Sequence, residues 1–276
     1  MRLVGFMNNG RRWIGELHPD GVRPIDDVEE YFRNGADTAP RGEFLDPATL
    51  EPAPPVPATA KVFCVGLNYR AHAEEVKVSP VDAVPTVFGR WASTLSCDGA
   101  DVPVPPGEGE LDWEGELAAI IGRPLLGAGE DESLAAVLGW TCFNDLSARR
   151  LQTRTPQWTL GKNGDLTAPM GPAIVADAGF DHRAQRLVTR VNGKVVQDAD
   201  TADMIFSPGQ VLAHISQALT VQPGDVVALG TPSGVGASMT PPRAARPGDV
   251  VEVEISGIGT LRNRLTPARP LPDRHR

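Results

Sequence analysis

Many short apolar runs, separated by turn residues, make up the hydrophobic pattern of this chain. Runs of roughly four to eight residues bounded by Gly, Pro, Asn or Asp are typical of strands in a β-rich domain. Asn192-Gly193 lies between two such runs and predicts a tight hairpin turn. The pattern predicts strands at residues 3–7, 12–17, 61–66, 84–88, 113–121, 140–144, 173–176, 187–191, 194–197, 226–228 and 250–255.

Only a few segments have helical character. Residues 26–34 begin with an Asp pair that suits a helix start, and Ser207-Pro208 suits the start of a helix over residues 206–218. The other predicted helices are residues 69–77 and 147–152. Many short strands with few helices place the chain in a β-rich α+β class.

The sequence predicts a small N-terminal α+β domain at residues 1–55 and a main domain at residues 56–270. Residues 51–57 are rich in Pro, which favours a stiff, extended linker. A length of 276 residues allows one large domain with a small appendage. The 29 Gly and 26 Pro favour short strands joined by turns over long helices.

Composition and charge exclude several classes of function. The net charge is −9 and no basic run precedes the Arg-containing tail, which argues against a nucleic-acid partner. The chain lacks both an apolar stretch of membrane-spanning length and the apolar segment of a signal peptide, so we expect a cytoplasmic protein without a membrane partner. Three widely spaced Cys form neither a disulfide framework nor a zinc pattern, and we expect reduced thiols.

Two carboxylates in Asp112-Trp113-Glu114-Gly115-Glu116 lead directly into an apolar run. Residues i and i+2 of a strand share a face, so Glu114 and Glu116 are expected to project together. Adjacent buried carboxylates repel each other and lose hydration unless a cation neutralises them. A third carboxylate, Asp145, follows another apolar run. Three oxygen ligands without clustered His or Cys predict a Mg²⁺ or Mn²⁺ site.

A second candidate feature is a His–Glu pair. If the segment that follows Tyr69 is helical, His72 and Glu75 are i and i+3 and close enough to pair. A carboxylate that orients an imidazole produces a general base for water. The alternative is a solvated surface helix, and residues alone leave both interpretations open.

Three further segments carry candidate ligand groups. On a short helix Arg149 and Gln152 share a face beside Asp145, and the planar fork of Arg suits a substrate carboxylate. Lys162 suits neutralisation of an enolate or a second carboxylate. The Gly-rich residues 229–236 could direct backbone N–H groups and the Thr231 hydroxyl at an oxyanion. Surface cations and a plain tight turn are the alternatives.

Seven motifs in this order resemble the fumarylacetoacetate hydrolase family over about residues 60–265. They are Gly-x-Asn-Tyr-x-x-His-x-x-Glu (66–75), Asp-Trp-Glu-x-Glu-Leu (112–117), Asn-Asp-x-Ser-Ala-Arg-x-x-Gln (144–152), Gln-Trp-Thr-Leu-Gly-Lys (157–162), Gln-Asp-x-x-Thr-x-x-Met-Ile-Phe (197–206), Gly-Thr-Pro-Ser-Gly-Val-Gly (230–236) and Gly-Ile-Gly-Thr-Leu-Arg-Asn (257–263). The first 55 residues look like the family's small, variable N-terminal domain.

The resemblance implies a mixed β-sandwich roll and a homodimer. It implies that Mg²⁺ or Mn²⁺ is held by three ligands, Glu114, Glu116 and Asp145. It implies a water-activating dyad of His72 and Glu75, on a segment that often orders only over bound substrate. The positions that match the family's substrate contacts are Arg149, Gln152, Lys162 and Thr231.

The sequence departs from the family pattern at three places near the expected site. Arg150 stands where Asp is usual, and Arg90 stands where Lys is common. Asn163-Gly164-Asp165 replaces Ser-Phe-Asp, so a bulky aromatic is missing near the pocket wall. These changes leave the expected metal ligands intact and concern the choice of substrate.

The combined expectation is a metal-dependent hydrolase that cleaves the C–C bond of a 2,4-dioxo acid of the acylpyruvate or fumarylpyruvate type. Water activated by His72 and Glu75 would attack C4, and the metal and Lys162 would stabilise the resulting enolate. The alternative is a decarboxylase or isomerase of oxaloacetate or of dioic acids from aromatic ring cleavage. A more remote alternative is a non-catalytic module that binds a metal and a small acid.

Overall fold

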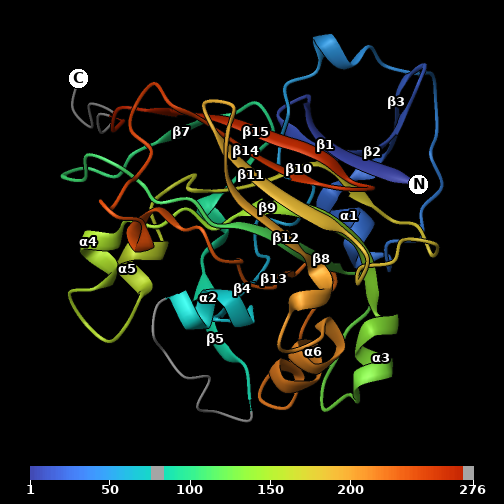
Figure 1. Ribbon diagram of the computed structural model, residues 1–276. Coiled ribbons are helices and arrows are strands. Elements are labelled where there is room, and N and C mark those ends of the chain that lie inside the picture. Colours follow the sequence, from blue (N-terminus) through green and yellow to red (C-terminus); the bar gives the residue numbers. More distant parts are fainter. Residues whose placement is uncertain (76–83, 270–276) are drawn as a thin grey trace, which may run out of the picture.

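Two mixed β-sheets packed face to face form the centre of the molecule (Figure 1). The structure is a computed structural model that describes residues 1–75 and 84–269. Within them, the larger sheet has ten strands and the smaller has five. The larger runs in the order β3 (Gly21–Asp27), β2 (Arg11–His18), β1 (Arg2–Asn8), β10 (Ala168–Val175), β9 (Val137–Asn144), β8 (Gly115–Ile121), β13 (Val226–Ala228), β4 (Val62–Gly66) and β5 (Thr86–Arg90), with β6 (Leu95–Cys97) beside β10. The smaller runs in the order β12 (Lys194–Asp200), β11 (Arg186–Val191), β14 (Val250–Ile255), β15 (Gly259–Thr266) and β7 (Asp101–Pro103).

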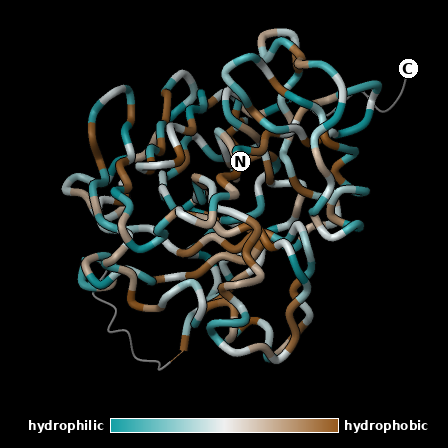
Figure 2. Tube along the Cα trace, turned by 90° about the vertical axis from the view of Figure 1, so that its right-hand side faces the viewer, coloured by the Kyte–Doolittle hydropathy of each residue, from teal (hydrophilic) through white to brown (hydrophobic). Residues whose placement is uncertain are grey.

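Strand β8 is buried on both faces, which explains its continuous apolar sequence. Leu117 and Ala119 belong to the core cluster between the two sheets, whereas Ala118 and Ile120 belong to the cluster on the opposite face. Hydrophobic stretches accordingly run through the middle of the molecule, and peripheral loops are mainly hydrophilic (Figure 2). The start of β8, where the candidate ligands lie, is therefore held by packing from both sides.

The helices are short and lie around the sheets (Figure 1). Helix α6 has the cap expected from its sequence, because Ser207 and Gln210 form a reciprocal capping box ahead of Pro208. In the described part of the chain no helix is long and apolar enough to cross a membrane. The helices are α1 (Val28–Arg33), α2 (Arg70–Glu75), α3 (Glu130–Ala135), α4 (Arg149–Gln152), α5 (Thr159–Lys162) and α6, with bounds Pro208–Ser216, and the 3₁₀ turns are η1 (Pro47–Thr49), η2 (Ala92–Thr94), η3 (Thr201–Asp203) and η4 (Gly236–Ser238).

The β-rich α+β class and the mixed two-sheet architecture are confirmed, as is the hairpin at Asn192-Gly193. Several predicted bounds differ. The strand expected from residue 113 begins at Gly115, because Asp112 pairs with Ser147 in an isolated bridge before β8 starts. The same bridge delays the helix expected from residue 147, which begins at Arg149. Of the helix expected at residues 69–77, the last two positions lie outside the described residues.

Four strands, β3, β6, β7 and β15, were not predicted. Strands β6 and β7 have three residues each and depend on pairing with β10 and β15, which a local pattern does not reveal. Strand β15 alternates buried and exposed positions, but Asn263 is one of its three buried residues and the exposed ones are polar, so few apolar residues mark the strand in the sequence. Strand β3 contains Pro24, which is a residue that disfavours a strand assignment.

The N-terminal segment extends the large sheet, because β1 pairs with β10. Leu3 and Tyr31 share a core cluster with Ile120 of the main domain. The Pro-rich residues 51–57 run alongside β1, where the Met7 N–H donates to the Glu51 carbonyl at 2.8 Å. The division into domains at residues 1–55 and 56–270 stays a prediction.

Gly115 offers a test of how closely packing controls the site. A Cβ at this position would collide with Thr189 Oγ1 and lie within 3.2 Å of Val253, both on the smaller sheet. We expect Gly115→Ala to lower the unfolding free energy by about 1–3 kcal/mol through overpacking, measured by urea denaturation. Thr189→Ala in the same chain should recover part of this loss. Gly109→Ala, with open space around its Cβ, is the matched control, and equal stability of the Gly115→Ala protein and wild type would contradict the expectation.

Candidate active site

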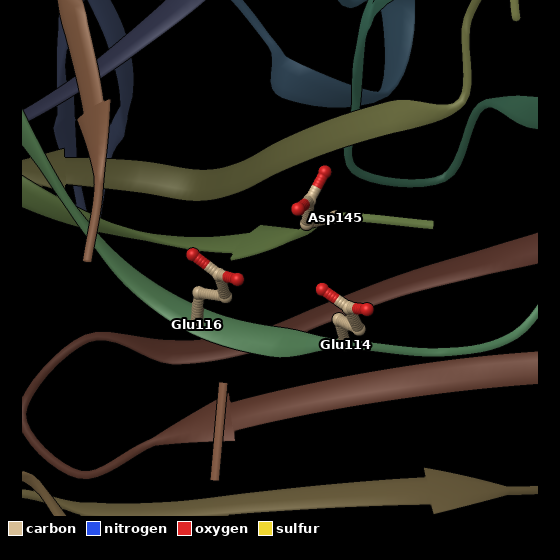
Figure 3. Close-up of side chains that lie close together, drawn as sticks. All are labelled: Glu114, Glu116 and Asp145. Atoms are coloured by element: carbon tan, nitrogen blue, oxygen red, sulfur yellow. The ribbon is translucent and has the colours of Figure 1, made fainter. Parts of the chain in front are cut away.

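Three buried carboxylates converge at the junction of β8 and β9. Glu114 and Glu116 lie side by side and point toward Asp145, which directly follows β9 (Figure 3). One ligand oxygen from each of the three lies within 4.8 Å of the others. Their exposed fractions are 6%, 1% and 1%, so protein groups must replace most of their hydration. The i, i+2 spacing brings Glu114 and Glu116 together, as the sequence predicted.

Three cations surround this cluster. Lys162 Nζ donates to Glu114 Oε2 at 2.8 Å and to Asp145 Oδ2 at 2.6 Å. Arg90 Nε donates to the other Asp145 oxygen at 2.5 Å, and Arg149 Nη2 lies 2.6 Å from Glu114 Oε1. Both oxygens of Glu114 and both oxygens of Asp145 therefore contact a cation.

Among the residues that the structure describes, Glu116 has no such partner. Its Oε2 accepts from the Gly230 N–H at 2.8 Å. Burial, then the charges of Asp145 and Glu114, raise the pKa of Glu116 well above its usual value. For Glu114, burial acts in the same direction, but Lys162 and Arg149 outweigh it and hold the pKa low. An oxygen-only donor set with one uncompensated carboxylate suits a divalent cation such as Mg²⁺ or Mn²⁺.

The His–Glu pair forms on α2 as its spacing predicted. His72 Nδ1 lies 3.0 Å from Glu75 Oε2, and Glu75 Oε1 accepts from the Gly234 N–H at 3.0 Å. An ionised carboxylate can only accept, so the pair places the proton on Nδ1 and leaves Nε2 as the basic nitrogen. His72 is buried and its ring lines the candidate cavity. This geometry suits a general base.

Arg149 and Gln152 share one face of α4, as expected. Arg149 Nη1 donates to Gln152 Oε1 at 2.8 Å, which leaves the Gln152 amide hydrogens for another acceptor. Arg149 Nε donates to Asp112 Oδ2 at 2.8 Å. A guanidinium has five N–H groups, so Nη1 and Nη2 each retain one for a ligand carboxylate.

The Gly-rich segment uses part of its backbone to bind protein carboxylates. Its N–H groups at Gly230 and Gly234 donate to protein carboxylates, Glu116 and Glu75. The Thr231 hydroxyl donates to the Gly115 carbonyl at 3.0 Å and accepts from Gln197. The segment therefore positions acidic side chains, and Thr231 faces the cavity as an acceptor.

These groups meet at a cavity of about 490 Å³. Phe88 and Trp158 form an aromatic wall, with ring centroids 5.3 Å apart and Lys162 Nζ 5.2 Å from the Phe88 ring. The predicted site residues that line the cavity are His72, Glu114, Arg149, Gln152, Lys162 and Thr231. The other three, Glu75, Glu116 and Asp145, are joined to the cavity through bonds to lining residues or to the same loop.

Several supporting residues were missed from sequence. Gln197 accepts from the Gly115 N–H at 3.0 Å and donates to Thr231, so it links β12 to the start of β8. Asn68 donates to the carbonyls of Phe206 and Leu229, which fixes the entry to α2. Both lie in motifs quoted above, but the partners of Asn68 are 138 and 161 residues away and those of Gln197 are 34 to 82 residues away, so no local pattern identifies them.

The residues that depart from the family pattern can each be described by their local contacts. Arg90 is fully buried against Asp145, whereas Arg150 is an exposed residue that pairs with Glu108 at 2.5 Å. Asn163 ends α5 and accepts from the Trp91 N–H at 2.7 Å. A Cβ at Gly164 would lie 2.7 Å from Pro105, so the aromatic usual there has no room.

Comparison with known proteins agrees with this architecture. Residues 61–266 match the family described as fumarylacetoacetate (FAA) hydrolase C-terminal. A mitochondrial oxaloacetate tautomerase of Homo sapiens is 40% identical over 214 residues, covering 76% of this chain and 68% of that protein. An oxaloacetate tautomerase of Bacillus subtilis is 38% identical over 216 residues, covering 76% of this chain and 71% of that protein.

Solved structures give the same result. The 5-carboxymethyl-2-hydroxymuconate delta-isomerase of Mycobacterium smegmatis has a TM-score of 0.82 and 30% identity, covering 97% of this chain and 100% of that one. A fumarylacetoacetate hydrolase of Exiguobacterium antarcticum has a TM-score of 0.81 and 30% identity, covering 98% and 100%. With the family matched across residues 61–266 and relatives at 40% identity, the chain belongs to the fumarylacetoacetate hydrolase family.

Proposed function

We propose that this protein is a divalent-metal-dependent isomerase that interconverts the keto and enol forms of a small 2-oxo diacid of the oxaloacetate class. One observation carries the proposal: His72, the candidate general base, lines the same cavity as Glu114, which belongs to a carboxylate cluster suited to a divalent cation. The names of the relatives at 38–40% identity support it, because they are oxaloacetate tautomerases. This replaces C–C hydrolysis, the first expectation from sequence, with its stated alternative.

The chain's own residues can perform the proton transfer. Arg149 and Gln152 offer N–H donors to the substrate C1 carboxylate, which holds C3 toward α2. His72 Nε2 removes a proton from C3, and the electron pair forms the C2–C3 double bond as charge moves to the 2-oxo oxygen. Glu75 stabilises the imidazolium that results. Return of this proton from the imidazolium to the 2-oxo oxygen gives the enol and restores the neutral His72. A cation held by Glu114, Glu116 and Asp145 would supply Lewis-acid polarisation of the 2-oxo group.

The hydrogen bonds of the Gly-rich segment also favour isomerisation over hydrolysis. Attack of water at C4 creates a second oxyanion, which needs its own hydrogen-bond donors. In the described structure the N–H groups of Gly230, Gly234 and Gly236 and the Thr231 hydroxyl hydrogen already bind protein acceptors. Hydrolysis would have to find its donors elsewhere. The homodimer and the cytoplasmic location remain predictions.

The proposal predicts that purified protein with Mg²⁺ or Mn²⁺ accelerates the decay of the oxaloacetate enol band in ultraviolet absorbance. His72→Asn should lower kcat/KM for this reaction by about 10²–10⁴-fold, because general-base catalysis is lost. His18→Asn, which changes an exposed histidine on β2, is the matched control and should behave as wild type.

The same samples should be assayed for pyruvate release from acetylpyruvate, fumarylpyruvate and oxaloacetate. Hydrolysis of an acylpyruvate without enol decay would overturn the proposal in favour of the C–C hydrolase. Metal binding without turnover of any substrate would indicate a binding module. An unchanged rate in His72→Asn would remove the histidine from the mechanism.

A second prediction concerns the metal. Adding Mn²⁺ to about 100 times its Kd should stabilise the protein by about 2.7 kcal/mol, which is several degrees in melting temperature. Glu116→Gln should lose most of this shift. Without metal the variant should be at least as stable as wild type, since the amide replaces a carboxyl whose raised pKa already disfavours charge. Glu43→Gln, in an exposed loop, is the control, and a full shift in Glu116→Gln would exclude Glu116 as a ligand.

A further inference from the structure

Asp112 is a buried carboxylate that the proposed reaction does not use. It is 1% exposed and lies outside the lining of the active-site cavity. Its Oδ1 accepts from the Gly236 N–H at 2.7 Å, and its Oδ2 accepts from the Ala237 N–H at 3.0 Å and from Arg149 Nε at 2.8 Å. Three donors around two oxygens require a carboxylate, because an amide would direct its own hydrogens at one of them.

Asp112 also joins three segments that carry the site. Its backbone pairs with Ser147 in both directions at 2.9 Å, two residues before Arg149. It lies two residues before Glu114, and its side chain binds the end of the Gly-rich segment. Asp112 therefore lies where α4, the start of β8 and the Gly-rich segment meet.

Arg149 lies between two cavities, and this makes its orientation important. It lines the active-site cavity of about 490 Å³ and also a second cavity of about 270 Å³. Asp112, Ser147 and the exposed Arg243 line the second cavity and not the first. The bond from Arg149 Nε to Asp112 fixes the plane of the guanidinium, so that Nη1 and Nη2 face Gln152 and Glu114 on the active-site side.

We propose that Asp112 is a positioning residue that holds Arg149 toward the active-site cavity and thereby sets the affinity for the substrate carboxylate. The inference rests on the proposed role of Arg149 in binding that carboxylate. Without the Asp112 carboxylate, the guanidinium loses its Nε contact and keeps the contacts to Gln152 and Glu114, so its plane is less firmly held against turning toward the second cavity. The consequence is weaker substrate binding with a largely intact proton-transfer step, because His72 and Glu75 do not contact Asp112.

The first test measures binding and turnover of Asp112→Asn. Its affinity for oxalate in the presence of Mn²⁺, measured by calorimetry, should fall about tenfold or more. Its KM should rise by a similar factor while kcat changes less. Glu108→Gln is the matched control, because it breaks the 2.5 Å pair with the neighbouring Arg150 and leaves Arg149 untouched. Oxalate affinity equal to wild type, or a loss confined to kcat, would overturn the proposal.

A second test starts from a variant that keeps Asp112 and removes the arginine. Arg149→Ala should bind oxalate weakly, and millimolar guanidinium, far below denaturing concentrations, should restore part of the affinity by occupying the place beside Asp112. Rescue should be absent in Arg149→Ala with Asp112→Asn. Rescue that persists without the carboxylate would refute the role of Asp112. Because oxalate binding needs no turnover, a chain that binds oxalate but does not isomerise oxaloacetate would refute the proposed function alone.

Discussion

Repulsion among three buried carboxylates is the constraint on which the rest of the site depends. Glu114, Glu116 and Asp145 bring their oxygens within 4.8 Å in a place that water scarcely reaches. Such an arrangement folds only if the surrounding elements supply positive charge and hydrogen-bond donors. Lys162 and Arg90 supply it from α5 and β5, each fully or almost fully buried. Helix α5 and strand β5 pack against each other, and this packing brings both cations to the carboxylates.

The Gly-rich segment also supplies hydrogen-bond donors to acidic side chains, and these donors are backbone N–H groups. Small residues at 230, 234 and 236 allow the chain to approach side chains that a Cβ would displace: at Gly230 a Cβ would lie 2.7 Å from Asn68. Three of its N–H groups each hold a different acid, Glu116, Glu75 and Asp112. The segment thereby connects the candidate ligand Glu116, the partner of His72 (Glu75) and the partner of Arg149 (Asp112). A turn that looks from sequence like a binder of substrate oxyanions is better understood as a scaffold for protein carboxylates.

Sequence reasoning worked where a contact is local and failed where it is distant. Glu114 with Glu116, and His72 with Glu75, are two and three residues apart, so strand and helix periodicity alone places them together. The contacts of Gln197 with Gly115 and of Arg90 with Asp145 join strands far apart in the chain. Arg90 was noticed only as a departure, because a buried guanidinium and a surface one look alike in sequence. The sheet order and the short strands β6 and β7 were hidden for the same reason.

Arg90 holds the backbone around Asp145 as well as the carboxylate itself. A lysine there could place one ammonium near Asp145, whereas Arg90 also donates to the Leu146 carbonyl at 2.5 Å and to Thr167 at 3.2 Å. The fork therefore fixes the backbone that follows Asp145 and leads to Arg149. Asn163 joins α5 to the Gly89 carbonyl and the Trp91 N–H on either side of Arg90. This layer of contacts therefore supports the segments that carry Lys162 and Arg149 from behind the three carboxylates.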